Sequence, residues 1–174
     1  MSVIVRSVAV EVDRAALLAR AAPYSSRPSR LDTICLAGLI AAGELLDGVD
    51  DVPTSRHLLT LGTALGCAEA DFEYYTQILG RGLRRTNPRI FAYTLPNVVM
   101  GEVSIAFGLT GDNLCFSAGR ASGLCAIGEA HQAIACGAAD VAIALCLDVV
   151  GPAAERLFGA LGTTPTPIAA AFLL

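Results

Sequence analysis

The most informative stretch of this chain is GDNLCFSAGRASGLCAIGEAHQAIACGAA, residues 111–139. It predicts a short strand over 113–117, a tight turn containing Gly119, and a helix from Arg120 to Cys136. Small and apolar residues lie nearly all round this helix, so we expect it to be buried between two layers. A strand, a tight turn and a helix start also present backbone N–H groups, which can hold a carbonyl oxygen or an anion.

The rest of the chain alternates predicted strands with predicted helices. Further strands are expected over 3–12, 57–65, 141–147 and 167–174, and further helices over 14–20, 31–46, 68–79, 96–107 and 151–159. Helices between strands imply right-handed crossovers and a mostly parallel sheet. We therefore expect an α/β fold in a single domain that spans residues 1–174.

Composition limits the classes of function. The chain is 54% hydrophobic and only 16% charged, so we expect another chain to cover part of its surface. A net charge of −4 gives no reason to propose nucleic acid as a partner. No apolar run approaches the ~20 residues of a membrane span, and the N-terminus does not read as a signal peptide. The six cysteines form no CxxC pair, so we expect a cytoplasmic protein with buried thiols and without a metal or cofactor.

Four segments in order carry a family resemblance: LPNVVMGE at 95–102, FGLTG at 107–111, SAGRASGLCAIGEA at 117–130 and GAADVAIAL at 137–145. Together they resemble the N-terminal half of β-ketoacyl-acyl carrier protein synthases (ketosynthases), members of the thiolase-like superfamily. The resemblance covers about residue 30 to the C-terminus. It implies a thiolase-like half of βαβαβαββ order, with a five-stranded sheet in the order 3-2-1-4-5 and the last strand antiparallel.

The main departure from this family is Arg120. It stands where the resemblance places the nucleophilic cysteine, and a guanidinium cannot form a thioester. The resemblance also implies two catalytic histidines and a lysine in a second half, which would begin after Leu174. We therefore expect a non-catalytic subunit similar to a chain length factor, in fatty-acid, aryl-polyene or polyketide biosynthesis. Its expected role is to complete a dimer with an active ketosynthase and to shape the acyl tunnel.

The resemblance also suggests site residues. Candidates for the acyl tunnel or an interface are Met100, Ile105, Phe107, Arg120, Leu124 and Cys125. Candidates for contact with an acyl carrier protein are Arg81, Arg84, Arg85 and Arg89, although such a cluster is more often a solvated loop. The expected partner is a second copy or a complete ketosynthase, bound through strand 113–117 at the sheet edge and helix 120–136. The alternative is a self-associating acyl- or lipid-binding protein that needs no ketosynthase.

Several of these residues have alternative interpretations. Arg120 is either a solvated residue at a helix start or a group that plugs the acyl site or pairs with a carboxylate. Cys125 lies more than a turn into an apolar helix, which favours an inert thiol. Ser122 in GRASG does not match the GxSxG nucleophile elbow. His57 and His131 have no metal-ligand spacing, so both are expected to be structural.

Overall fold

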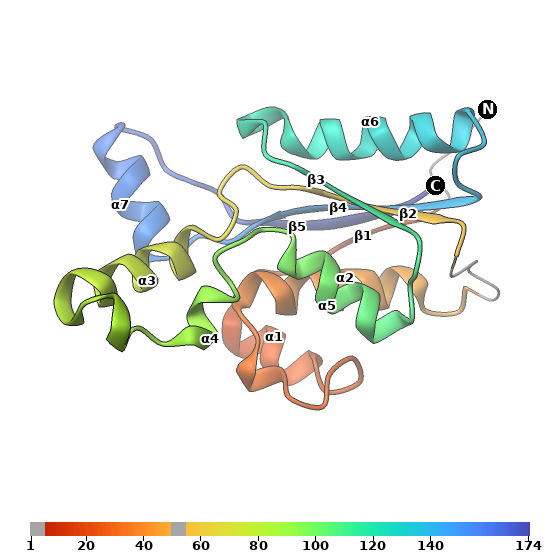
Figure 1. The fold of residues 1–174 in the computed structure, drawn as a ribbon. Coiled ribbons are helices and arrows are strands. Elements are labelled where there is room, and N and C mark those ends of the chain that lie inside the picture. The colour runs from red at the N-terminus through yellow and green to blue at the C-terminus, as the bar shows by residue number, and fades with distance from the viewer. Residues whose placement is uncertain (1–5, 50–54) are drawn as a thin grey trace.

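The computed structural model describes residues 6–49 and 55–174, and Figure 1 shows their arrangement. The predicted strand over 3–12 and the acidic connection over 48–53 fall partly outside these ranges. The strands are β1 (Arg6–Ala9), β2 (His57–Gly62), β3 (Asp112–Phe116), β4 (Val141–Asp148) and β5 (Ile168–Leu173). The α-helices are α1 (Arg14–Arg20), α2 (Thr33–Leu46), α3 (Ala68–Arg81), α4 (Pro88–Phe91), α5 (Val98–Phe107), α6 (Ser122–Ala135) and α7 (Pro152–Ala160). Short 3-10 turns are η1 (Pro28–Arg30), η2 (Leu83–Arg85) and η3 (Gly119–Ala121).

Sequence signals explain where several helices begin and where one of them ends. The carboxylate of Asp13 accepts a hydrogen bond from the backbone N–H of Ala16 and caps α1, and Asp32 accepts one from Ile34 and caps α2. Gly108 ends α5 in the left-handed conformation, with φ of 65°. Part of the expected basic loop is helical, because Asn87 caps a short helix that opens on Pro88.

The described strands form one mixed sheet in the order β1-β5-β4-β2-β3. The expected order 3-2-1-4-5 is therefore wrong, and so is the expectation of a mostly parallel sheet. β2 pairs in parallel with β3 and β4, whereas β5 pairs antiparallel with both β4 and β1. The antiparallel last strand is as expected.

Burial explains why β1 lies at the edge rather than at the centre. β1 alternates between half-buried and exposed residues, whereas all six residues of β2 and the middle six of β4 are buried. Strands that are apolar on both faces occupy the middle of a sheet, and a strand with polar alternation suits an edge. The expected edge position of β3 is confirmed, since β2 is its sole neighbour in the described sheet.

Helices cover the two faces of the sheet unequally (Figure 1). α2 and α5 lie on one face within the main hydrophobic core, and α2 is buried along almost its whole length. α6 covers the opposite face, where a second and smaller core is built largely from alanines such as Ala130, Ala133 and Ala142. Within the described residues, no helix is long and apolar enough to cross a membrane.

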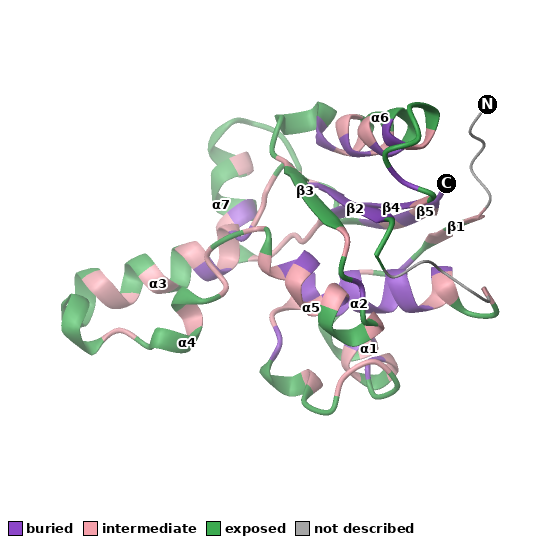
Figure 2. Cartoon of the chain, turned by 45° about the vertical axis from the view of Figure 1, so that its right-hand side comes forward, coloured by how far each residue is buried: buried purple, intermediate pink, exposed green. Residues whose placement is uncertain are grey.

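The chain's own elements provide only one of the two layers that were expected to bury helix 120–136. α6 buries Ser122, Ala126, Ala130 and Ala133 against the sheet, whereas Leu124 on its outer side is 75% exposed. Figure 2 shows this mixture of buried and exposed residues along α6. Small residues all round the helix allow close packing on either side, but the chain supplies a covering layer on one side only.

Candidate functional site at the turn before α6

The chain reverses direction between β3 and α6 through a turn that depends on Gly119. Gly119 has a φ of +58°, a conformation that L side chains rarely adopt. The buried hydroxyl of Ser122 accepts a hydrogen bond from the N–H of Ala118 at 2.9 Å and donates one to the carbonyl of Gly119 at 2.6 Å. Ser122 therefore stabilises the turn, and its hydroxyl is committed to the backbone.

The start of α6 is held close to the sheet by contacts with β2 and β4. The buried hydroxyl of Thr60 donates to the carbonyl of Ala126 at 3.0 Å, and the thiol of Cys146 lies 3.6 Å from the carbonyl of Gly123. A Cβ on Gly62 would lie 2.2 Å from the carbonyl oxygen of Ser122. The backbone of β2 thus needs glycine to approach the first turn of α6.

Asp148 at the end of β4 fixes the neighbouring loop. Its Oδ1 accepts hydrogen bonds from the hydroxyl of Thr63 at 2.8 Å and from the N–H groups of Ala64 and Leu65 at 2.9 and 2.7 Å. Sequence reasoning overlooked Asp148. The available signal was a carboxylate directly after an apolar strand, where a partly buried charge requires donors.

A mostly apolar cavity of about 330 Å³ opens beside this turn. Its walls come from the ends of β2 and β4, the start of α6 and one side of β5; they include Gly62, Arg120, Leu124, Ile127, Cys146, Asp148, Ile168 and Phe172. Arg120 is exposed and makes no hydrogen bond or ion pair with another described residue. The cavity can therefore hold an apolar group beside one guanidinium.

The cysteines near this site are poorly suited to nucleophilic attack. Burial, with a smaller contribution from the charge of Asp148, raises the pKa of Cys146 to about 11. Cys125 is partly buried and lies within α6, one turn beyond the helix start. His57 is buried in β2, and His131 is exposed on α6. In the described part of the chain, no group of three or more potential ligands could hold a metal ion.

The candidates for the acyl tunnel are divided between the two faces of the sheet. Arg120 and Leu124 line the cavity at the turn, whereas Met100, Ile105 and Phe107 lie on α5. Met100 is buried in the main core, Ile105 is 83% exposed, and the ring of Phe107 packs 5.9 Å from that of Tyr24. The chain alone does not bring these two groups into one cavity.

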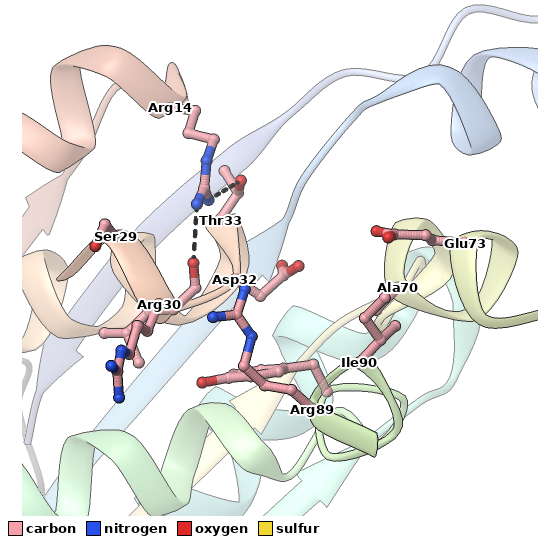
Figure 3. A pocket seen from close by; sticks show the side chains of 11 residues that line it. Arg14, Ser29, Arg30, Asp32, Thr33, Ala70, Glu73, Arg89 and Ile90 are labelled. Carbon is pink, nitrogen blue, oxygen red and sulfur yellow. Dashed lines mark hydrogen bonds between the residues drawn. The ribbon is translucent and has the colours of Figure 1, made fainter. Parts of the chain in front are cut away.

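A second cavity of about 330 Å³ collects arginines from separate parts of the chain (Figure 3). Arg14 on α1, Arg30 in η1 and Arg89 on α4 line it together with the carboxylates of Asp32 and Glu73. The guanidinium of Arg14 donates to the Thr33 hydroxyl at 2.9 Å and to the Leu31 carbonyl at 3.1 Å. Of the four predicted carrier-protein contacts, only Arg89 lines this cavity; the other three, Arg81, Arg84 and Arg85, lie at the end of α3 and in η2.

Comparison with known proteins identifies the family. Residues 11–167 match the β-ketoacyl synthase N-terminal domain. The chain belongs to the β-ketoacyl synthase family. It is 28% identical over 119 residues to 3-oxoacyl-[acyl-carrier-protein] synthase 2 of Vibrio cholerae and 28% identical over 118 residues to that of Staphylococcus aureus. Each match covers 66% of this β-ketoacyl synthase-like chain but only 29% and 28% of the relatives, so the chain spans less than a third of their length.

Solved structures agree with this fold. A type II polyketide ketosynthase in complex with its acyl-carrier protein superposes with a TM-score of 0.80 at 18% identity, covering 98% of this chain and 61% of that one. A ketosynthase in complex with its chain length factor, from Xenorhabdus doucetiae, gives a TM-score of 0.74 at 16% identity, covering 98% and 76%. These likenesses place the chain in the thiolase-like fold of the β-ketoacyl synthases.

Proposed function

We propose that this chain is a non-catalytic ketosynthase-like subunit of the chain-length-factor type, which pairs with an active ketosynthase in fatty-acid, aryl-polyene or polyketide biosynthesis. The observation that carries the proposal is Arg120 in the turn between β3 and α6, where the family resemblance places a cysteine nucleophile. A guanidinium stays protonated and has no lone pair available for attack on a thioester.

Neighbouring groups do not replace the missing nucleophile. The hydroxyl of Ser122 is buried and bonded to the turn, and the thiol of Cys146 has a pKa of about 11. A thiol with that pKa is almost fully protonated at neutral pH and is therefore a weak nucleophile. The site supports binding rather than covalent acyl transfer.

Two exposed surfaces support pairing with another subunit. Four of the five residues of β3 are exposed, and no strand among residues 6–49 and 55–174 pairs with it on the side away from β2. The outer side of α6 exposes Leu124 next to the cavity. Unpaired strand edges and exposed apolar residues favour association. We place the ketosynthase on strand 113–117 and helix 120–136.

Within such a complex, the chain would shape the acyl tunnel with residues on both sides of β3. Met100, Ile105 and Phe107 on α5 would form one part of the wall, and Arg120 with Leu124 on α6 the other. Carrier-protein contact would use exposed arginines. Arg89 is the best supported of the four candidates, because it shares a cavity with Arg14 and Arg30.

Association with a ketosynthase tests the proposal. The chain and a complete ketosynthase from the same organism would be mixed, and complex formation measured by analytical ultracentrifugation. We expect a 1:1 complex that is lost in a Leu114→Pro variant, because proline at the edge strand interferes with strand pairing. A Leu161→Ala variant, at the residue that directly follows the distant α7, is the control and should bind normally. Absence of a complex with the native chain at micromolar concentrations would reject the proposal.

The apolar cavity favours a second candidate function. A space of about 330 Å³ beside one guanidinium suits an acyl chain that is bound without a covalent link. A self-associating acyl- or lipid-binding protein would use it without a ketosynthase. Native mass spectrometry after incubation with octanoate distinguishes the two candidate functions. A homodimer that retains octanoate and does not bind the ketosynthase supports the lipid-binding alternative.

A further inference from the structure

α3 carries an apolar stripe on its exposed side. Phe72, Tyr75 and Leu79 follow the i, i+3, i+7 spacing of one helix face and are 44%, 63% and 87% exposed. Leu83 continues the stripe just beyond the helix and is 65% exposed. Figure 2 shows that α3 and α4 project from the body of the molecule, with exposed residues along α3. Three large apolar side chains on a projecting helix and a fourth just beyond it are an unusual exposed patch.

The inner side of the same helix is already occupied. Tyr74 packs its ring 5.5 Å from that of Phe91 on α4, and Ala70 is buried. Arg156 of α7 lies over the ring of Phe72, with 5.3 Å between the guanidinium carbon and the ring centroid. At Phe72 the stripe is thus partly covered by Arg156, whereas Tyr75 and Leu79 are left largely uncovered by the chain's own elements.

Charge along α3 is polarised from end to end. Its first turns carry Asp71 and Glu73, whereas Arg84 and Arg85 follow its C-terminal end and are exposed. Glu69 also lies in the first turn, but its carboxylate is not available to a partner because it accepts hydrogen bonds from the N–H groups of Ala153 and Ala154 in α7. Neither Arg84 nor Arg85 makes an ion pair with another described residue.

We propose that α3 is a self-association surface, on which a second copy of this chain packs its own α3 in the antiparallel direction. A two-fold axis near Gln77, in the C-terminal half of the helix, places Tyr75 against Leu79 of the second copy, and Leu79 against its Tyr75. The acidic half of each helix then faces the basic half of the other. A parallel arrangement would instead place like charges together, so the charge pattern selects the antiparallel one.

The interface is small. α3 has 14 residues and is about 21 Å long, so the contact falls at the lower end of specific interfaces. We expect a dimer with a dissociation constant on the order of micromolar, which weakens several-fold between 50 mM and 1 M NaCl because exposed ion pairs are screened. This surface is separate from β3 and α6, so the inference does not depend on the proposed pairing with a ketosynthase.

The sharpest test reverses the acidic pair in one variant and the basic pair in another. One variant carries Asp71→Arg and Glu73→Arg, the other Arg84→Glu and Arg85→Glu, and sedimentation velocity measures association of each alone and of their mixture. Each variant alone should bind itself at least tenfold more weakly than the native chain. Their 1:1 mixture should form a heterodimer at least as tight as the native dimer, because all facing charges are then opposite. A mixture that stays monomeric overturns the proposal.

Two single variants distinguish the α3 surface from the proposed ketosynthase-binding surface on β3 and α6. Leu79→Lys should weaken self-association at least tenfold while leaving binding to a ketosynthase unchanged, because it lies in the centre of the stripe. Leu124→Lys, at a similarly exposed leucine on α6, should leave self-association unchanged. A native chain that is monomeric at 200 µM, or a Leu79→Lys variant that dimerises normally, would refute the inference. Circular dichroism checks that each variant is folded.

Discussion

The closest backbone approach at the candidate site predicts a large effect for the substitution Gly62→Ala. The added Cβ would lie 2.2 Å from the carbonyl oxygen of Ser122, 2.5 Å from its carbonyl carbon and 2.7 Å from the Cα of Gly123. All three atoms belong to the backbone, so no side chain can rotate away. The first turn of α6 would have to retreat by about 1 Å to reach an ordinary contact of 3.4 Å.

The expected cost follows from this geometry. Overpacking usually costs about 1–3 kcal/mol, and we expect the upper end because the helix must shift as a unit and strain the Thr60–Ala126 hydrogen bond. For a chain of 174 residues, a loss of about 3 kcal/mol lowers the melting temperature by roughly 6–12 °C. Urea denaturation followed by circular dichroism measures the change in unfolding free energy.

Gly128→Ala is the matched control. Gly128 lies on the exposed side of the same helix, and an added Cβ meets nothing within 4 Å. Alanine is the better helix former, so this variant should gain about 0.5–1 kcal/mol. If Gly62→Ala were as stable as the native chain, or Gly128→Ala lost as much as Gly62→Ala, the described packing of α6 on β2 would be wrong.

Two further predictions concern the same region. Asp148→Ala should lose about 1–3 kcal/mol of unfolding free energy, because the N–H groups of Ala64 and Leu65 lose their acceptor; Asp148→Asn should lose less, and equal losses would contradict this role. The free energy of unfolding should also fall as the pH rises above about 9. Burial raises the pKa of Cys67 to about 12 and of Cys146 to about 11. These thiols therefore stay protonated in the folded chain while they ionise in the unfolded chain, which favours unfolding. Urea denaturation at pH 8 and pH 10 measures this, and serine at both positions should flatten the slope; a stability that is constant or rises across that range would refute it.

Sequence predicted the local structure around the site well. The strand expected over 113–117 is found at 112–116, and the helix expected from 120 begins as a 3-10 turn at Gly119 before α6 starts at Ser122. These features follow from local signals: an apolar strand, a glycine turn and a small-residue helix. The same local signals placed Arg120 at the first position of the helix, whereas the structure places it in the 3-10 turn η3, two residues before α6.

Long-range pairing was not predictable in the same way. The antiparallel pairing of β1 with β5 joins Arg6 to Leu173 across nearly the whole chain, and no local pattern specifies it. The exposed outer side of α6 could not be read from its composition either, because a helix rich in alanine and glycine suits one packing partner as well as two. Arg14 and Arg30 escaped notice because their common cavity with Arg89 depends on the fold of three separate segments.

Covalent acylation is the most direct test of the central claim that this site does not perform acyl transfer. The chain would be incubated with octanoyl-acyl carrier protein at pH 7, beside a complete ketosynthase as the positive control, and analysed by intact-mass and peptide mass spectrometry. We expect an octanoyl adduct on the ketosynthase and none on residues 117–125 of this chain. An octanoyl group on Ser122 or Cys125 would contradict it.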